Sequence, residues 1–342
     1  MKEHQNLFRD LQEDFRKMKK NLLVAQSGGP TAAINATLAG VIKQAIKEEQ
    51  IDQVYGACYG IQGVLEQKFV NLTEKVDTEE KLEKLKRTPA AALGSCRFKL
   101  NDIKEDDSQY QEIVDILHKM NIGYFVYIGG NDSMDTVAKL SAYCKEKGER
   151  LFAYEYNGYW KDVGTLSSYW EANMELIDII PVFNLYEEFW RIYTKSDTLP
   201  PQYIADTAKI ERSIISEGCD IYGEVYNSVI GAGVTIEEGA VVRDSIIMKN
   251  SVIKKDAKIN KAIIAEEVVI DENTEIGVGE EAPSKLSKKI YASDIATIGE
   301  QTYIPKNVKV GKNTVIMGKT KPEDYPDGLL ESGDYIIKAG EM

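Results

Sequence analysis

Two glycine turns in the first half of the chain carry residues suited to binding phosphate. The first is Gly28-Gly29, and the second is the run Gly129, Gly130, Asn131, Asp132 and Ser133. Each turn follows a short apolar run and precedes a helical pattern. Backbone N–H groups and the positive end of a helix dipole meet at such a turn, and both attract anions. The two turns therefore predict phosphate binding.

A cation and two carboxylates accompany these turns. Arg97 lies with Lys99 on the glycine-rich stretch TPAAALGSCRFKL, and a guanidinium can bind phosphate through two parallel hydrogen bonds. Asp132 or Asp135 can help to hold Mg²⁺, which prefers oxygen ligands. An alternative is that Asp132 and Asp135 only cap the helix that they precede, a role that Asp fills well. Both interpretations can hold together.

The elements around these turns predict a partial doubly wound, Rossmann-like α/β sheet. Residues 22–25 and 124–128 form apolar runs typical of buried strands. After the first turn, apolar side chains recur on one helical face at Ile34, Leu38, Val41, Ile42 and Ala45. In doubly wound folds the turn from a strand into a helix is where phosphate binds.

Four segments of this region resemble the pyrophosphate-dependent phosphofructokinases. QSGGPTAAIN, YGIQGVL, LGSCRFKL and YIGGNDSMDT occur in that family's order and at about its spacing, within residues 21–148. The resemblance implies that Gly28, Gly29 and Arg97 line the phosphoryl-donor site. It also implies that the second turn, from Gly129 to Ser133, holds phosphate and magnesium. The ATP-using relatives have glycine where this chain has Asp132, and an Asp there fits a donor without a nucleoside.

The resemblance stops before that family's catalytic segment. The family's PKTIDND motif supplies the aspartate that takes a proton from the sugar hydroxyl, and the sequence contains no such motif. The later loops that hold fructose 6-phosphate in that family do not occur in this sequence either. We therefore expect a donor pocket without a general base, and the catalytic residues are unknown.

Residues 210–318 repeat with a period of six. From Ile230 the hexads read IGAGVT, IEEGAV, VRDSII, MKNSVI and KKDAKI, and the register falters at Lys254. The first position is Ile230, Ile236, Val242 and Met248, the fourth is small, and the fifth is Val234, Ala240, Ile246 and Val252. Such a period predicts a triangular parallel β-helix with aliphatic side chains stacked inside. The alternative is a β-sandwich whose alternation has this period by chance.

The chain from about residue 149 to its end resembles the bacterial glucose-1-phosphate adenylyltransferases. YWKDVGT at residues 159–165 reproduces a motif of that family, and DYPDG near the end also matches it. A helix is expected to begin near Ser167 with a cap from Thr165 or Ser167. The resemblance implies a left-handed β-helix, and it implies that Asp162 helps to bind a metal. Alternatively, Lys161 and Asp162 form a surface ion pair.

This second resemblance is also partial. The GxGxRL nucleotide loop and the glucose-1-phosphate lysine of the adenylyltransferases do not occur here. The sequence thus predicts a helix at 1–20, a phosphofructokinase-like partial domain at 21–148, a nucleotidyltransferase remnant at 149–205 and a β-helix at 206–342. The two pieces meet without a linker, so we expect unpaired sheet edges. The α/β sheet is expected to extend over residues 21–205.

The composition of the chain limits the classes of partner and the compartments that we expect for it. A net charge of −13 argues against nucleic-acid and anionic-membrane partners, and no apolar run has membrane-spanning length. The four cysteines are scattered, which favours a reducing cytoplasm. Leu7, Phe8, Leu11, Phe15 and Met18 fall on one helical face and predict a docking helix.

Four interpretations of function remain open. The first two are residual phosphorylation of fructose 6-phosphate and residual synthesis of ADP-glucose from ATP and glucose 1-phosphate. The third is a catalytically incomplete protein of sugar-phosphate metabolism that binds pyrophosphate or sugar phosphates. Its β-helix would form homo-oligomers or assemble with a full-length adenylyltransferase, as the resemblance implies. The fourth is a recombination product with no joint function.

Overall fold

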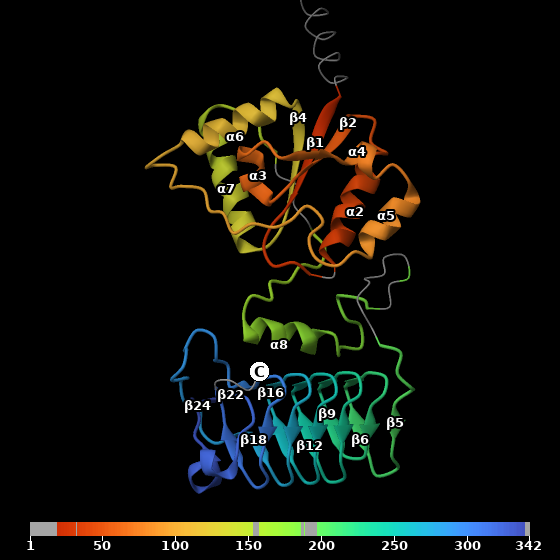
Figure 1. Ribbon diagram of the computed structural model, residues 1–342, viewed down its shortest axis with the longest axis vertical. Coiled ribbons are helices and arrows are strands. Elements are labelled where there is room, and N and C mark those ends of the chain that lie inside the picture. Colours follow the sequence, from red (N-terminus) through yellow and green to blue (C-terminus); the bar gives the residue numbers. More distant parts are fainter. Residues whose placement is uncertain (1–18, 32, 153–156, 186–187, 189–196, 339–342) are drawn as a thin grey trace, which may run out of the picture. The chain divides into compact units, whose positions relative to one another are not determined.

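A computed structural model describes residues 19–31, 33–152, 157–185, 188 and 197–338 of the chain. These residues group into two compact units. The first is drawn from residues 1–156 and 188–196, and the second from residues 157–187 and 197–342. Figure 1 labels the elements of both units, each of which is described by itself below.

The first unit contains a four-stranded sheet with β1 (Lys20–Gln26) in its interior. Along the sheet the order is β3 (Phe69–Asn71), β2 (Ile51–Ala57), β1 and β4 (Ile122–Ile128). β1 runs parallel to both β2 and β4, and β3 is antiparallel to β2. Its helices are α2 (Ile34–Ala45), α3 (Gly60–Leu65), α4 (Leu72–Lys75), α5 (Glu79–Lys86), α6 (Ser108–Lys119) and α7 (Asn131–Glu146).

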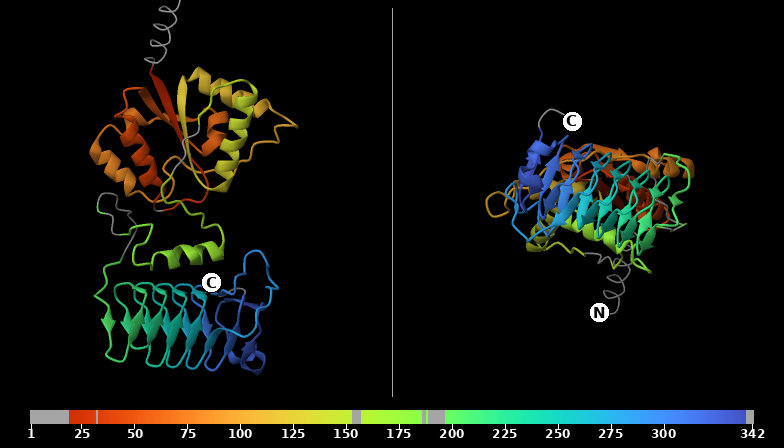
Figure 2. Two further views of the ribbon diagram at one scale, coloured as in Figure 1. Left: turned by 180° about the vertical axis from the view of Figure 1, so that it is seen from behind. Right: turned by 90° about the horizontal axis from the view of Figure 1, so that it is seen from below.

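Helices cover both faces of this sheet, because side chains on β1 alternate between two apolar clusters. Leu22 and Val24 pack in the cluster that contains residues of α2 and α5. Leu23 and Ala25 pack in the cluster that contains residues of α3, α6 and α7. Figures 1 and 2 show these two groups of helices on opposite sides of the strands. The predicted doubly wound α/β sheet is confirmed.

β4 forms one edge of this sheet. Tyr124 on β4 is exposed, as are Met134 and Val137 on α7. The expectation that the sheet extends over residues 21–205 is wrong. Its last strand ends at Ile128, and the described part of residues 157–202 contains no strand. That stretch contains a helix that packs on the β-helix.

The second unit is a parallel β-helix with three faces. One face consists of β7 (Ile214–Ile215), β10 (Val229–Ile230), β13 (Ile246–Ile247), β16 (Ala262–Ile264), β19 (Ala296–Ile298), β22 (Val315–Met317) and β24 (Tyr335–Ile337). The second consists of β5 (Tyr203–Ile204), β8 (Asp220–Ile221), β11 (Thr235–Ile236), β14 (Val252–Ile253), β17 (Val269–Ile270) and β20 (Tyr303–Ile304). The third consists of β6 (Lys209–Glu211), β9 (Glu224–Tyr226), β12 (Val241–Arg243), β15 (Lys258–Asn260), β18 (Glu275–Val278), β21 (Lys309–Gly311) and β23 (Leu329–Leu330). Two short 3₁₀ turns, Pro322–Asp324 and Pro326–Gly328, lie near its end.

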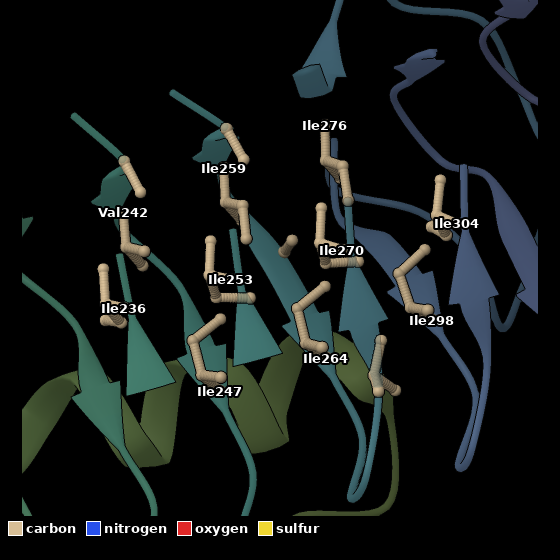
Figure 3. Packing of buried hydrophobic residues seen from close by; sticks show 14 of the residues in the cluster. Ile236, Val242, Ile247, Ile253, Ile259, Ile264, Ile270, Ile276, Ile298 and Ile304 are labelled. Atoms are coloured by element: carbon tan, nitrogen blue, oxygen red, sulfur yellow. The ribbon is translucent and has the colours of Figure 1, made fainter. Parts of the chain in front are cut away.

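Aliphatic side chains stack in columns inside the β-helix, as Figure 3 shows. The columns confirm the predicted architecture but correct its register. Val229 pairs with Ile246, and Val241 pairs with Lys258, so each of these coils is 17 residues long. A coil of three strict hexads would be one residue longer, and the missing residue falls at one corner. Ile247 rather than Met248 therefore lies inside the coil. The register shifts between Val242 and Ile247, before Lys254.

Serine side chains line the shorter corner. The Ser245 backbone N–H donates to Ser228 Oγ at 3.1 Å, and the Ala262 N–H donates to Ser245 Oγ at 3.0 Å. Asp244, just before this corner, has φ +47°, a conformation that Asp tolerates better than most residues. The small fourth position of the repeat thus has a physical reason at Ser245: its hydroxyl bonds the next coil.

Helix α8 (Leu166–Glu175) belongs to the second unit and covers one outer face of the β-helix. Ile246 and Ile263 point outward there and pack with Trp170, whose indole Nε1–H donates to the Asp244 carbonyl at 2.7 Å. Thr165 caps the helix by accepting from the Ser168 N–H at 3.1 Å. The predicted helix start and its Thr165 cap are confirmed.

Candidate functional site

The two predicted glycine turns meet in the first unit. Gly28 has φ +80°, and a β-carbon added to it would lie 3.5 Å from the backbone nitrogen of Gly130. The Ser27 N–H donates to the Ile128 carbonyl at 2.8 Å, so the turns are joined where β1 and β4 end. Nothing lies within 4 Å of a β-carbon added to Gly29 or Gly130. The backbone of both turns is therefore open to a ligand.

Ser133 lies beneath the second turn. It is only 3% exposed, and its Oγ has no hydrogen-bond partner among the described residues. A β-carbon on Gly129 would lie 2.0 Å from Ser133 Oγ and 3.0 Å from the Ser27 carbonyl oxygen, so only glycine fits. A buried hydroxyl without a partner is costly. A ligand oxygen at the turn would supply the missing partner.

The N-terminus of α7 has no side-chain cap. Gly130 is its N-cap residue, so Asp132 and Asp135 do not precede the helix as the capping alternative supposed, but lie within it. Asp132 lies in the first turn of the helix, after Asn131, its first residue. Asp135 lies farther along and pairs with Lys139 at 2.8 Å. The helix end is thus suited to an external anion.

Two buried amides hold the loop at residues 88–93 against this site, and sequence reasoning did not single them out. Asn35 donates to the Thr88 and Ala90 carbonyls at 2.8 and 2.6 Å. Gln26 donates to Asn35 Oδ1 at 3.0 Å and accepts from the Leu93 N–H at 2.9 Å. Both residues are fully buried. A signal was present at Asn35, because this polar residue stands among the apolar residues of AAINA.

The loop then carries Arg97 to the first turn. Ser95 Oγ donates to the Gly28 carbonyl, and Ser27 Oγ donates to the Cys96 carbonyl at 3.0 Å. Arg97 is exposed. It lines a hollow of about 290 Å³ together with Tyr59, Gln62, Glu66, Lys68, Ser95, Cys96 and Phe98. Ser95 and Cys96, which directly precede Arg97, are therefore bonded to the first glycine turn.

The Tyr127 side chain holds the start of α3 next to the loop that contains Cys96. Tyr127 on β4 accepts the Ile61 N–H through its hydroxyl at 3.1 Å, which fixes the start of α3. A β-carbon on Gly60 would lie 2.7 Å from this hydroxyl and 2.8 Å from Cys96 Sγ. Burial raises the pKa of Tyr127 above its ordinary value. Its hydroxyl therefore stays neutral and serves a structural role.

Asp162 belongs to the second unit, whereas Asp132 belongs to the first. Asp162 accepts from the Gly164 N–H at 3.2 Å. Lys161 pairs with Glu175 at 2.5 Å and with Glu171 at 3.5 Å, so the alternative of a Lys161–Asp162 surface pair is wrong. The hydrogen bond with Glu175 is the main reason why the pKa of Lys161 is raised.

The part of the chain that the structure describes contains no group of three or more His, Cys, Asp or Glu residues able to hold a metal ion. Mg²⁺ commonly binds through one or two carboxylates together with phosphate oxygens and water. Asp132 is compatible with such a role because its half-exposed carboxylate lies in the first turn of α7. No described helix is long and apolar enough to cross a membrane.

Comparison with known families separates the two parts of the chain. The Phosphofructokinase family model matches residues 21–179, and the GlmU-like C-terminal hexapeptide model matches residues 202–298. The glucose-1-phosphate adenylyltransferase of Lachnospira eligens is 67% identical over 199 residues, 58% of this chain and 47% of that protein. The glucose-1-phosphate adenylyltransferase of Thermotoga neapolitana is 51% identical over 197 residues. This match also covers 58% of this chain and 47% of that protein. The chain thus spans about half the length of these curated relatives.

Among solved structures, the pyrophosphate-dependent phosphofructokinase of Nitrosospira multiformis is 36% identical with a TM-score of 0.36. The match covers 39% of this chain and 32% of that one. The chain is a hybrid in which a phosphofructokinase-like segment precedes a hexapeptide β-helix, with extensive similarity to glucose-1-phosphate adenylyltransferases.

Proposed function

We propose that this chain is a phosphate-binding protein of sugar-phosphate metabolism that lacks a complete catalytic centre of either parent family. One observation carries the proposal. The two glycine turns meet at the uncapped start of α7, above a buried Ser133 hydroxyl that has no partner among the described residues. A phosphate oxygen at this point receives backbone N–H groups and the Ser133 hydroxyl together.

Pyrophosphate is the proposed ligand. Asp132 projects from the first turn of α7, where its bulk and charge disfavour the α-phosphate of a nucleotide, as the resemblance implies. Mg²⁺ would be held by Asp132 and by the pyrophosphate oxygens, and it would neutralise part of the ligand's charge. Gly28, Gly29 and Arg97 would bind from the opposite turn, and Gly129, Gly130 and Asn131 from the second.

Catalysis is proposed to be absent because the resemblance assigns no general base. Phosphoryl transfer to a sugar needs a group within hydrogen-bond reach of the attacking hydroxyl, and the sequence contains no PKTIDND segment. The adenylyltransferase part likewise has no GxGxRL loop. Asp162 is the one position of that family's metal site which the sequence retains.

The second unit is proposed to mediate assembly. Its segment outside the β-helix exposes Ile179, Ile180 and Val182, which are 99%, 88% and 82% accessible. Tyr159 stacks on Phe183 at 5.3 Å between ring centroids, which ties the chain before α8 to the chain after it. Exposed apolar groups of this kind mark interaction surfaces. The partner is a second copy or a full-length adenylyltransferase, in the cytoplasm, where the four free cysteines stay reduced.

Binding and turnover need separate tests. The full chain is titrated with pyrophosphate in the presence and absence of Mg²⁺, and Ser133→Ala is compared with Ser141→Ala on the same helix. We expect binding, a loss of about fivefold or more in affinity for Ser133→Ala, and little change for Ser141→Ala. Coupled assays with pyrophosphate and fructose 6-phosphate, and with ATP and glucose 1-phosphate, should show no turnover. Turnover in either assay would favour residual activity of that parent.

Assembly is tested by sedimentation of the purified chain and by co-purification with an intact adenylyltransferase. We expect an oligomer or a mixed complex, and Ile180→Asp should weaken it. A chain that stays monomeric and captures no adenylyltransferase would contradict the assembly role.

A further inference from the structure

We propose that Lys99 is a positioning residue for the anion site and that it acts by neutralising Asp132. This inference rests on the proposed function, since it concerns the affinity of the same site for pyrophosphate. Lys99 Nζ lies 3.4 Å from Asp132 Oδ1. The pair links the loop that carries Arg97 to the first turn of α7, the two segments that flank the proposed ligand.

The pair contributes little to the stability of the fold. The side chains of Lys99 and Asp132 are 72% and 52% exposed, and ion pairs between exposed groups are worth little because water screens them and both side chains lose freedom. The loop has stronger anchors: Asn35 and Gln26 hold its start, and Ser95 and Ser27 hold its end. A stabilising role therefore does not account for this contact.

The Lys99–Asp132 pair has a larger effect on anion binding than on the stability of the fold. Pyrophosphate carries several negative charges, and the N-terminus of α7 attracts it through partial charges that amount to about half a positive unit. An unpaired Asp132 carboxylate in the first turn would cancel that attraction. Lys99 removes this repulsion while leaving the bulk of Asp132 in place. The site then keeps its steric selection against nucleotides and retains a net attraction for pyrophosphate.

A Lys99 that acts through Asp132 can be distinguished by measurement from a Lys99 that contacts pyrophosphate directly. If Lys99 acts through Asp132, its removal costs affinity only while Asp132 is charged. If it contacts pyrophosphate directly, its removal costs the same with Asp132 or with Asn at that position. A double-mutant cycle distinguishes the two, because it isolates the coupling between neighbouring residues.

The experiment measures the pyrophosphate dissociation constant of the full chain without divalent cations, at low and high salt. The variants are Lys99→Met, Asp132→Asn, the double variant and Lys99→Arg. The matched control is Lys139→Met, which breaks the Lys139–Asp135 pair farther along the same helix. We expect Lys99→Met to weaken binding about tenfold at low salt and much less at high salt. Lys99→Arg and Lys139→Met should remain close to the unaltered chain.

The double variant decides the mechanism. We expect it to bind within about twofold of Asp132→Asn, because neutral Asn needs no compensation. An equal loss from Lys99→Met in both backgrounds, or no loss in either, would overturn the inference while leaving the proposed function in place. If the unaltered chain binds no pyrophosphate, the proposed function fails, and this inference fails with it.

Discussion

Gly28 and Gly130 face each other across the ends of two neighbouring strands, with 3.5 Å between the Gly130 nitrogen and the point where a Gly28 side chain would begin. These residues lie about one hundred positions apart in the sequence. Their approach places two strand-to-helix turns on one site, which is the arrangement that parallel sheets use to bind phosphate.

Gly129 is expected to tolerate no side chain. In Gly129→Ala the new β-carbon would lie 2.0 Å from Ser133 Oγ and 3.0 Å from the Ser27 carbonyl oxygen. We expect a loss of about 1–3 kcal/mol in the stability of the first unit, together with loss of pyrophosphate binding. Hydrogen exchange of the β1 and β4 amides measures the stability. Gly130→Ala is the control for stability, because nothing lies within 4 Å of its β-carbon; an equal loss of stability in both variants would refute the argument.

The register of the β-helix is tested by two adjacent residues. Ile247 is 1% exposed inside the coil, whereas Met248 lies outside beside α8. We expect Ile247→Ala to reduce the free energy of unfolding by about 2–5 kcal/mol and Met248→Ala by about 1 kcal/mol. Urea unfolding followed by circular dichroism gives both values. The opposite order would restore the strict six-residue register.

The buried amide pair is expected to act as one unit. Asn35→Ala removes the donor to two carbonyls and the acceptor for Gln26. We expect a cost of about 1–3 kcal/mol and a similar cost for Gln26→Ala. The double variant should cost clearly less than the two single costs together, because the residues share a network. Strict additivity in urea unfolding would show that they act independently.

The end of the β-helix is expected to respond to acid through Asp324. The hydrogen bond from Lys338 Nζ, with help from the Lys321 N–H, holds the pKa of Asp324 below its ordinary value of 3.8. A carboxyl whose pKa is lower in the folded chain adds stability above its unfolded pKa and loses it as the pH falls through the folded value. The free energy of unfolding should therefore decrease below about pH 3.8.

Asp324→Asn should remove less than about 1 kcal/mol of this pH dependence, since the pair is partly exposed. Acid titration of the unfolding midpoint measures it, with Asp327→Asn in the neighbouring turn as the control. An identical acid response in the unaltered chain and in Asp324→Asn would show that this pair is not responsible.

Much of the fold was predictable because its signals are local. The run at residues 22–25, the glycine turn after it and the apolar face from Ile34 to Ala45 each depend on near neighbours, and the structure confirms them. The hexads predicted the β-helix for the same reason. What the sequence missed depends on contacts between distant residues.

Three features of the structure depend on such distant contacts. Met248 and Ile247 are equally apolar, and only the length of one corner decides which lies inside. Helix α8 packs on the β-helix through Trp170 and outward-facing isoleucines, which no local pattern reveals. Gln26 and Asn35 belong to the segment QSGGPTAAIN around the first glycine turn, and their side chains hold a loop 53 to 67 residues farther along the chain.

Calorimetric titration of the full chain with pyrophosphate and Mg²⁺ tests the central claim most directly. The account predicts saturable binding at one site per chain, lost in Gly129→Ala and retained in Ser141→Ala, with no turnover of fructose 6-phosphate. Absence of binding by the unaltered chain, or equal binding by both variants, would contradict it.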